Sequence, residues 1–526
     1  MNTTLSHDAP RRPTSVSPWP WRKALLLFLP LLLLVPAGTP AGAPGNVHAA
    51  VFAWAQEHPG EPVPVIVQAE QLEGTAAAIR QHGGTVEREL ALIQSIDATV
   101  PPGALGAIAA DDAVAWISLD ASVATADGGS GSTWTSSNSG SGSGLSGGNA
   151  YPYTVDADDA WSQGYIGAGV AVAVVDTGIS PSGHEDFKNF RGNSRVVAEV
   201  VVNQNTSNVT DGYGHGTHIA GIVGGNGKLL KGKYMGVAPG VNLVNVKVGD
   251  EEGSATLADV VAGLQWVYEN RLRYNIRVVN LSLHSSVQES YQTSPLSAAV
   301  EYLWFNGVFV VVAAGNNGSA PDAVFYPPSN DPFVMTAGAL DDMGTNSHGD
   351  DAPTPWSSNG VTQDGFRKPE LLTPGNNIVS VIDTNSILYK ENPKKVMDEK
   401  YLKLSGTSMA AGVMSGVAAL AFQAHPYWTP GQVKCTLIAT ASNLSGDFGA
   451  FSVPDTDSVT GRWSPSCDSD ANLAPSLGFT ALAKTALLAY VLGAADPAAA
   501  AAEAGLDPAE AGIAGKTLLT VDWSAI

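Results

Sequence analysis

The sequence has few cysteines, few charged residues and, above all, few basic residues. Two cysteines among 526 residues, Cys435 and Cys467, are too few for a disulfide-dense scaffold. Charged residues make up 14% of the chain and hydrophobic residues 44%, which excludes a chain that is disordered throughout. The 27 lysines and arginines face 49 aspartates and glutamates, and the net charge of −22 argues against nucleic acid as a partner. The 57 glycines follow no Gly-X-Y period, which excludes a collagen.

The sequence also lacks a hydrophobic run long enough to span a membrane. Residues 24–37 are apolar, but they include prolines and fall short of the roughly 20 residues that a spanning helix needs. A basic flank before this run and small residues after it are typical of a secretory signal peptide. We therefore expect residues 1–49 to be a signal, cleaved after Ala43 or Ala49, and the protein to be secreted without a stable membrane anchor. The alternative is a run that is retained as a membrane tether.

The pattern of residues 63–119 predicts a small ferredoxin-like α+β unit, because apolar strands and helices alternate in the order βαββαβ. The expected elements are strands at 63–67, at 85–100 (a pair) and at 114–119, with helices at 72–82 and 101–110. Gly83-Gly84 is a stop signal for the first helix. Residues 127–149 are rich in glycine and serine, which predicts a flexible linker that is open to proteolysis.

From residue 150 to about 440, the sequence predicts a larger α/β unit. Continuous apolar runs predict buried strands at 170–175, 243–248, 278–283, 308–314 and 334–337. Helical patterns lie between and after them, at 215–224, 255–270, 295–306 and 408–423. Buried strands that alternate with helices predict a mostly parallel sheet covered by helices on both faces. Residues 494–526 form an alanine-rich tail, expected to be helical, with no readable chemistry.

Reactive side chains stand beside glycines in three short segments. The segments are VAVVDTGIS (172–180), DGYGHGTHIAG (211–221) and LSGTSMAAG (404–412). Asp176 ends an apolar strand, whereas His215 and Ser408 each open a predicted helix. A serine nucleophile needs a base within hydrogen-bond reach, and the base needs a carboxylate that orients it. Histidine titrates near neutral pH and suits the role of the base.

Each of these residues also has an ordinary structural explanation. Asp176 in Asp-Thr-Gly suits a strand-end turn, and an aspartic protease needs a second such motif, which the sequence lacks. His215 and His218 have the spacing of a metal pair, but the glutamate of such a site is missing. Ser408 suits a helix cap. The occurrence of all three groups together, in this order, favours catalysis.

The three segments resemble the signature motifs of the subtilisin-like serine proteases, the subtilases, in which the same order Asp, His, Ser occurs. The segment VVAAGNNG (311–318) resembles the oxyanion-hole segment of the family, with Asn316 as the amide donor. The resemblance implies a subtilisin-like three-layer fold for residues 150–493. It also implies a serine endopeptidase that hydrolyses peptide bonds through an acyl-enzyme intermediate and needs no cofactor for catalysis.

The resemblance further implies that residues 50–126 are an inhibitory propeptide. This propeptide would assist folding, inhibit the enzyme from which it was made, and be cut off by that enzyme. Polypeptide substrates and the propeptide are the expected partners. An inactive, subtilase-shaped binding protein is the competing interpretation. Export would allow a disulfide bond between Cys435 and Cys467, which are otherwise thiols.

Several segments resemble the substrate-binding parts of subtilases. They are the edge strand Gly253, Ser254 and Ala255, the pocket wall Ser282, Leu283 and His284, the oxyanion segment Ala313, Ala314 and Gly315, and the pocket base Phe325. The family has small residues where His284 and Phe325 stand. We therefore expect a reduced pocket that favours small substrate side chains, unless either side chain points away.

Two further departures from the family concern calcium and the helix of the nucleophile. Asp186 resembles a calcium ligand of the family, but the loop 226–233 carries three lysines that repel a cation. We expect no calcium there, and structural calcium elsewhere stays possible because oxygen ligands are abundant. Gly412-Val413 replaces the usual Pro-His after the serine motif, and glycine predicts a less rigid helix.

Overall fold

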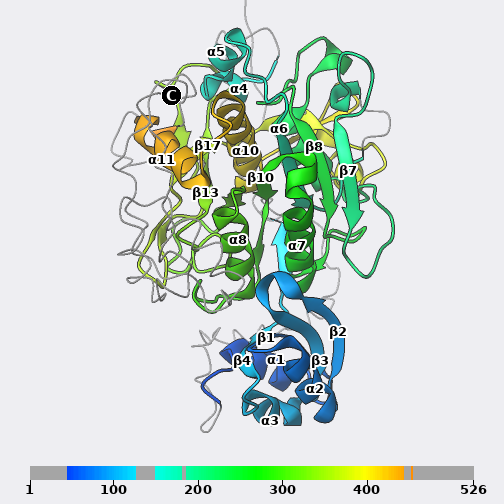
Figure 1. The fold of residues 1–526 in the computed structure, drawn as a ribbon. Coiled ribbons are helices and arrows are strands. Elements are labelled where there is room, and N and C mark those ends of the chain that lie inside the picture. The colour runs from blue at the N-terminus through cyan, green and yellow to red at the C-terminus, as the bar shows by residue number, and fades with distance from the viewer. Residues whose placement is uncertain (1–43, 126–147, 181–184, 444–451, 454–526) are drawn as a thin grey trace, which may run out of the picture.

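The computed structural model describes residues 44–125, 148–180, 185–443 and 452–453 (Figure 1). The predicted leader up to residue 43, most of the predicted linker, Cys467 and the alanine-rich tail lie outside these residues. The described residues form a small N-terminal unit, drawn in blue, below a larger unit in the view of Figure 1.

The small unit is a four-stranded antiparallel sheet with helices on one side. Its elements are α1 (Ala49–Glu57), β1 (Val63–Ala69), α2 (Leu72–Gln81), β2 (Thr85–Leu90), β3 (Ser95–Val100), α3 (Leu105–Ala109) and β4 (Val114–Leu119). The strand order β2-β3-β1-β4 is the one expected for a βαββαβ unit of the ferredoxin-like type. Helix α2 ends before Gly83, whose φ of +81° is accessible to glycine, in agreement with the predicted stop signal. Helix α1 was not predicted.

A mostly parallel sheet forms the centre of the large unit. Its strands are β6 (Ala171–Asp176), β7 (Val196–Val201), β8 (Asn242–Lys247), β10 (Ile276–Leu281), β12 (Phe309–Ala313), β13 (Met335–Asp341), β14 (Ala352–Pro353) and β17 (Leu371–Pro374). Their order is β14-β13-β12-β10-β6-β8-β7, and β17 also pairs with β13. Only the pair of β13 and β14 is antiparallel among these strands. Strands β6 and β12 are buried along their whole length, which explains their continuous apolar sequences.

Four long helices cover the two faces of this sheet. They are α6 (His215–Gly224), α7 (Leu257–Tyr274), α8 (Pro295–Phe305) and α10 (Thr407–Ala424). Helices α6 and α10 pack together on one face, and α7 and α8 pack together on the other (Figure 1). The predicted three-layer α/β fold is therefore confirmed. Helix α10 has the length and mean hydropathy of a membrane span, but 89% of that window is buried inside the protein, so it is a core helix.

Local sequence explains where the helices begin. Thr256 and Asp259 form a capping box at the start of α7, so this helix begins at Leu257 rather than at the predicted residue 255. Ser294 caps α8 through the Ser297 backbone N–H, with a proline at the first helical position.

A third sheet joins the two units. It contains β5 (Ser122–Thr125), β9 (Ala255–Thr256) and β11 (Leu283–Ser285), in the order β11-β5-β9 with both pairings antiparallel. Strand β5 follows directly from the small unit, and β9 and β11 belong to the large unit.

The remaining elements are short or peripheral. They are α4 (Tyr151–Thr154), α5 (Ala157–Ser162), α9 (Ile387–Glu391), α11 (Pro430–Thr440), β15 (Gly360–Val361), β16 (Arg367–Lys368), β18 (Ile378–Val381), β19 (Val396–Met397), β20 (Tyr401–Leu404), β21 (Ser442–Asn443) and β22 (Ser452–Val453).

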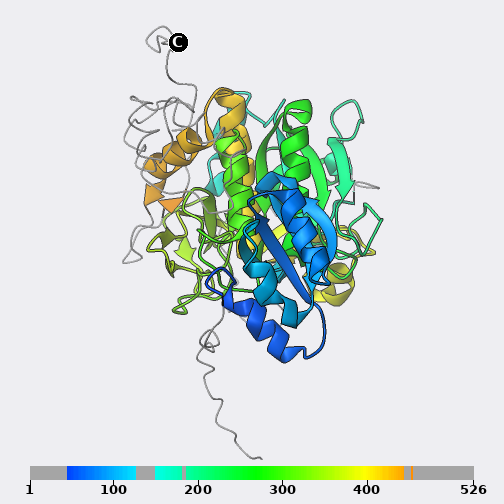
Figure 2. The same ribbon diagram turned by 60° about the horizontal axis from the view of Figure 1, so that its bottom comes forward.

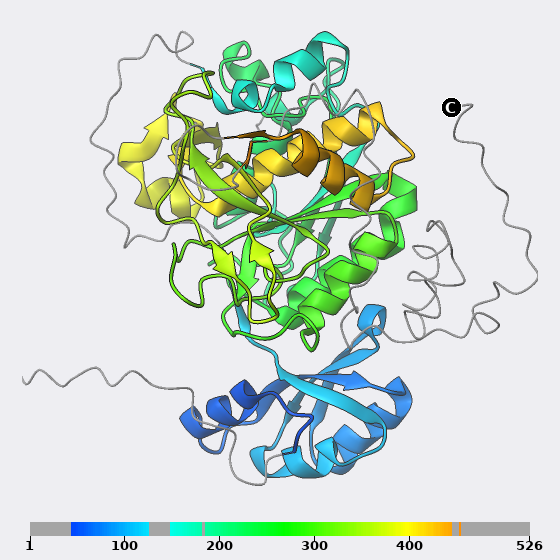
Figure 3. The same cartoon turned by 90° about the vertical axis from the view of Figure 1, so that its left-hand side faces the viewer.

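The sheet of the small unit faces helices α7 and α8 of the large unit, and its own helices lie on the far side (Figures 2 and 3). Arg88 of β2 pairs with Asp97 of β3 at 2.9 Å and with Asp259 of α7 at 2.8 Å. Ser118 Oγ of β4 donates to Glu289 Oε1 at 2.8 Å. These largely buried polar contacts fix how the small unit sits on the large one.

Glycines allow α10 to lie close to its neighbours. A Cβ added at Gly416 would lie 2.5 Å from Val237 Cβ. A Cβ added at Gly412 would lie more than 3 Å from the nearest atoms of Ile219 and Ile222 in α6. Gly412 therefore lies in the packed contact between α10 and α6. The packing does not measure how rigid the helix is, so the lower rigidity expected from this glycine stays a prediction.

We expect Gly416→Ala to lower the free energy of unfolding by about 1–3 kcal/mol, because the added methyl group overpacks the core. Thermal unfolding followed by circular dichroism measures the loss. Gly431→Ala is the matched control in α11, where a Cβ meets no atom closer than 3.9 Å and alanine should be neutral or slightly stabilising. Equal melting temperatures for the two variants would contradict the packing described for α10.

Candidate active site

A buried carboxylate and a buried imidazole meet at the carboxyl edge of the central sheet. Asp176 is the last residue of β6, and His215 is the first residue of α6. His215 Nδ1 lies 2.7 Å from Asp176 Oδ1, and neither side chain is more than 1% exposed. The Thr177 backbone N–H also donates to Asp176 Oδ1, at 2.7 Å. A carboxylate in this position favours the tautomer with the proton on Nδ1, which leaves Nε2 as a proton acceptor.

Ser408 is the second residue of α10, the helix that packs directly against α6. Its Oγ donates to the Ser282 carbonyl oxygen at 3.2 Å, and Ser282 Oγ donates to the Ser408 carbonyl oxygen at 3.0 Å. The first turn of a helix presents backbone N–H groups and the positive end of the helix dipole. The surroundings of Ser408 therefore favour a developing negative charge.

Asn316 lies beside the start of α10 as well. Its Oδ1 accepts hydrogen bonds from the Thr407 backbone N–H at 3.0 Å and from Thr407 Oγ1 at 3.2 Å. Thr407 Oγ1 in turn accepts from the Gly315 N–H at 3.0 Å. Both hydrogen bonds come from donors of Thr407, which identifies the acceptor atom as the amide oxygen and holds that oxygen at the start of α10.

The segment before Asn316 makes this approach possible. Ala313 ends β12, and the Ala314 N–H donates to the Ala337 carbonyl oxygen at 3.0 Å. Gly315 has a φ of +97°, a conformation that favours glycine. The chain therefore leaves the sheet at Ala313 and turns toward the start of α10.

His218 does not form a metal pair with His215. Its Nε2 lies 2.9 Å from the Leu402 carbonyl oxygen of β20, so its ring is held by the backbone of another sheet. Complete burial lowers the pKa of His218 to about 3, which keeps the ring neutral. Among the described residues, no group of three or more His, Cys, Asp or Glu side chains has an arrangement that could hold a metal ion.

The predicted edge strand and pocket wall flank β5 from opposite sides. Ala255 of β9 pairs with Val123, and Leu283 of β11 pairs with Thr125. The predicted strand at residues 253–255 is therefore only partly correct. Gly253 has a φ of +86°, and a Cβ added there would lie 3.0 Å from the Tyr213 ring. The Ser254 N–H donates to Asp250 Oδ1, so both residues belong to the turn before β9.

His284 and Phe325 are the two residues that were predicted to reduce the specificity pocket. The His284 ring lies 5.7 Å from the Tyr326 ring, and Nδ1 contacts the Ser285 carbonyl oxygen at 2.9 Å. Burial lowers the pKa of His284, which favours a neutral imidazole. Phe325 is half-buried and immediately precedes Tyr326. The imidazole of His284 is thus packed toward Tyr326, the neighbour of Phe325 in the chain.

Asp186, the residue that resembles a calcium ligand, has both carboxylate oxygens occupied by protein donors. Tyr401 OH donates to Oδ2 at 2.5 Å, and the Leu229 N–H donates to Oδ1 at 2.8 Å. Lys228 Nζ, in the same loop as Leu229, pairs with Glu185 at 3.0 Å. The loop is therefore tied to the rest of the protein by side chains and backbone groups.

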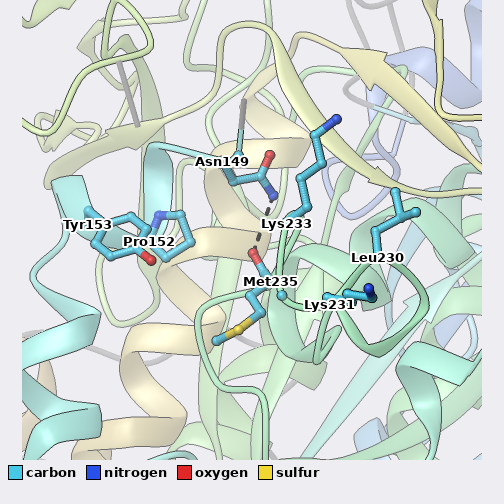
Figure 4. Close-up of a pocket in the computed structure, with 9 residues that line it drawn as sticks. Asn149, Pro152, Tyr153, Leu230, Lys231, Lys233 and Met235 are labelled. Atoms are coloured by element: carbon cyan, nitrogen blue, oxygen red, sulfur yellow. Dashed lines mark hydrogen bonds between the residues drawn. The ribbon is translucent and has the colours of Figure 1, made fainter. Parts of the chain in front are cut away.

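A cavity of about 420 Å³ borders this loop and contains none of the predicted site residues (Figure 4). Its lining includes Asn149, whose side chain donates to the Met235 carbonyl oxygen at 3.3 Å, and two lysines, Lys231 and Lys233. Lys233 Nζ pairs with Asp398 at 2.7 Å. The positive charges in this lining repel a metal cation. The lining contains none of Asp176, His215 and Ser408, so this cavity is not where the predicted reaction takes place.

Cys435 is half-buried in α11. Its predicted partner Cys467 lies outside the described residues, so their disulfide bond stays a prediction. Two residues with hydrogen bonds at the site were not singled out from the sequence: Thr407, which donates to Asn316, and Asp211, which accepts from Thr177 and Gly214. Both stood in the quoted motifs, but a motif does not say which polar residue bonds to which.

A mostly parallel α/β sheet that carries an aspartate, a histidine and a serine at the ends of its elements, in that chain order, is typical of the subtilisin-like serine peptidases. Comparison with known proteins agrees. The model of the subtilase family matches residues 167–461. The chain belongs to the subtilase family, and it is a serine-type endopeptidase.

Several curated relatives are bacterial peptidases. The chain is 38% identical over 315 residues to serine protease AprX of Bacillus subtilis (strain 168), which covers 57% of this chain and 68% of the relative. It is 34% identical over 296 residues to subtilisin DY of Bacillus licheniformis, and this alignment covers 56% of this chain and 91% of the relative. It is 30% identical over 382 residues to alkaline elastase YaB of Bacillus sp. (strain YaB), and this alignment covers 71% of this chain and 82% of the relative. The last alignment is longer than the large unit alone.

Proposed function

We propose that this chain is a secreted, self-processing serine endopeptidase in which Ser408 is the nucleophile, His215 the general base and Asp176 the orienting carboxylate. The observation that carries the proposal is the buried contact of 2.7 Å between His215 Nδ1 and Asp176 Oδ1, at the sheet edge beside the helix of Ser408. An enclosed imidazole–carboxylate pair of this kind stabilises the imidazolium that forms during acyl transfer.

In the proposed reaction, His215 Nε2 takes the proton of Ser408 Oγ while Oγ attacks the carbonyl carbon of the scissile bond. The tetrahedral intermediate collapses when the C–N bond breaks and the imidazolium gives its proton to the leaving amine. Water then attacks the acyl-enzyme, with His215 again as the base, and releases the carboxylic acid and free Ser408. Asp176 stays ionised throughout and holds the ring in place.

The oxyanion of both tetrahedral intermediates would be stabilised by the Ser408 backbone N–H and the Asn316 side-chain NH₂. The two bonds from Thr407 to Asn316 Oδ1 support this role, because they hold the amide at the start of α10, next to Ser408, and fix its orientation. A donor that is already oriented costs no reorganisation during the reaction.

We expect Asn316→Ala to fold normally and to lose a factor on the order of 10²–10³ in kcat, a magnitude that was measured for the corresponding donor of a subtilisin. The measurement is the hydrolysis of a peptide ester at saturating substrate. Asn317→Ala is the matched control, because the neighbouring side chain is exposed. Wild-type turnover in Asn316→Ala would remove Asn316 from the oxyanion hole.

We propose that residues 50–126 are an inhibitory propeptide. Strand β5 supports this role, because it pairs on both sides with segments that resemble the substrate-binding strands of subtilases. Substrates that bind by strand addition use the same main-chain hydrogen bonds. The position of this strand supports a processing site as well: β5 ends at Thr125, one residue before the end of the predicted propeptide, and its partner β11 directly follows Ser282, whose carbonyl oxygen accepts from Ser408. The bond after Ala126 is therefore the proposed cleavage site.

We expect the purified wild-type protein to be cleaved and its mature chain to begin at Asp127, whereas Ser408→Ala should accumulate as the longer precursor. Intact-mass spectrometry and labelling with a fluorophosphonate make the test. Ser415→Ala is the matched control: this hydroxyl is also buried in α10 but bonds to Asn280 at 3.0 Å, so cleavage should continue. Normal processing and labelling of Ser408→Ala would overturn the proposed mechanism.

The specificity pocket is proposed to accept small side chains. The support is the His284 ring packed toward Tyr326, together with alanine at the proposed cleavage site. One methylene group in an apolar pocket changes the transition-state free energy by about 1–3 kcal/mol, so a bulky wall residue has a large effect.

We expect wild-type kcat/KM to be at least about tenfold higher for a substrate with alanine before the cleaved bond than for one with phenylalanine. In His284→Gly the wider pocket should reduce or reverse this ratio. Unchanged turnover of the alanine substrate is the internal control for intact catalysis. A wild-type preference for the phenylalanine substrate would contradict the proposed small pocket.

No cofactor is proposed for catalysis, since the residues above supply the base, the nucleophile and the oxyanion donors. We also propose that the Asp186 region binds no calcium, because its carboxylate already accepts two protein hydrogen bonds. Secretion and the bond between Cys435 and Cys467 are proposals that rest on the N-terminal leader sequence.

A further inference from the structure

We propose that Asp211 is a positioning residue that holds Asp176 and His215 in their reactive register by bonding to both chain segments that carry them. The inference rests on the proposed function, because it assigns a role within that active site. Asp211 is only 2% exposed and lies four residues before His215.

Four protein donors converge on the Asp211 carboxylate. Oδ1 accepts from the Gly214 N–H at 2.7 Å and from Thr177 Oγ1 at 2.8 Å. Oδ2 accepts from Thr217, both from its backbone N–H at 2.8 Å and from its Oγ1 at 2.7 Å. Thr177 directly follows Asp176, and Gly214 directly precedes His215. The carboxylate therefore spans the two segments whose side chains meet at 2.7 Å.

The two threonine hydroxyls extend the network to further backbone groups. Thr177 Oγ1 accepts from the Gly216 N–H at 3.0 Å, and Thr217 Oγ1 accepts from the Ser180 N–H at 3.0 Å. Because each hydroxyl already accepts from an N–H group, its own proton is available to Asp211. All four bonds therefore run toward the carboxylate, which is the pattern of an ionised acceptor.

Steric contact leaves this region little room to adjust. A Cβ at Gly178 would lie 3.2 Å from Asp211 Cα, and a Cβ at Gly216 would collide with the Gly178 carbonyl oxygen. The turn after β6 and the start of α6 are thus in direct backbone contact. Loss of the carboxylate would leave buried donors unsatisfied in a place where they can move only by shifting one segment against the other.

Such a shift acts on the reaction through His215 and Asp176. A displacement of about 1 Å in a reacting group can cost on the order of 10²-fold in rate. The imidazolium would also lose stabilisation, both from a displaced Asp176 and from the removed charge of Asp211. Loss of Asp211 therefore lowers kcat and makes the protonated form of His215 less favourable.

Other charged and titratable groups lie around this network. Lys247 Nζ donates to the Thr210 carbonyl oxygen at 2.6 Å and pairs with Glu251 at 3.0 Å. His218, on the same helix as His215, is kept neutral by burial. Burial raises the pKa of Asp211 and its four donors oppose that rise. The titratable groups that face the network from β6, α6, β8 and the loop after β8 are therefore Asp176, His215, His218, Lys247 and Glu251.

The test compares Asp211→Asn, Thr177→Val and Thr177→Ser in kcat, KM and the pH dependence of kcat/KM on a peptide substrate. We expect Asp211→Asn to lose about 10–100-fold in kcat with little change in KM, and its acid limb to move to lower pH. Thr177→Val, which removes two bonds of the network, should show a smaller change in the same direction. Thr177→Ser, which keeps the hydroxyl, should restore wild-type behaviour.

Asp331→Asn is the matched control for a purely structural effect. Asp331 is another fully buried carboxylate with a backbone donor, the Phe333 N–H at 2.9 Å, and the charged groups that act on it are Glu301, Lys368 and Lys434. We expect it to lower the melting temperature without moving the acid limb. If Asp211→Asn behaves like Asp331→Asn, the positioning role is wrong.

Fluorophosphonate labelling separates the two ways to fail. If the wild-type protein neither hydrolyses peptides nor labels at Ser408, the proposed function fails before Asp211 is tested. If wild type labels and turns over while Asp211→Asn does so at the same rate and with the same acid limb, only the role of Asp211 fails. Should Asp211→Asn not fold, the pair Thr177→Val and Thr177→Ser decides the question alone.

Discussion

The contact between His215 and Asp176 is the constraint on which the site depends, and it follows from the parallel sheet. Residues 39 positions apart meet because β6 ends at Asp176 and the chain returns over the same sheet edge before α6 begins. In a parallel sheet every strand presents its carboxyl end to one edge, so side chains from distant segments converge there. Ser408 reaches that edge through α10, which packs against α6.

Such a site requires polar groups to be buried, which is costly unless each finds a partner. The structure meets this demand mainly with backbone and hydroxyl donors rather than with cations. Asp176 accepts from Thr177, Asp211 from Thr177, Gly214 and Thr217, and Asn316 from Thr407. Fixed dipoles of this kind hold charges in place without neutralising them. A metal ion or a lysine there would compete with the imidazole for its carboxylate.

The sequence predicted the central sheet and the contact between Asp176 and His215 from features that are local in the chain. Short continuous apolar runs such as residues 308–314 are typical of strands buried on both faces, and Asp176, His215 and Ser408 stand in motifs with their own glycines. The sequence did not predict β5 between β9 and β11, the bonds from Thr407 to Asn316, or the role of Asp211. These features depend on pairing between segments far apart in the chain, and hydrophobic periodicity carries no information about such pairs.

The location of β5 also explains how a proposed propeptide can remain an inhibitor after it is cut. Cleavage after Ala126 would separate β5 from the chain that follows but leave it joined to the small unit. That unit stays attached through contacts outside the reaction, such as Arg88 to Asp259 and Ser118 to Glu289. The cut therefore removes none of the contacts that hold β5 between β9 and β11. Strand β5 binds through main-chain hydrogen bonds, which a substrate strand can also form. A substrate lacks the contact between the small unit and the large unit, so it would bind less tightly than the attached β5.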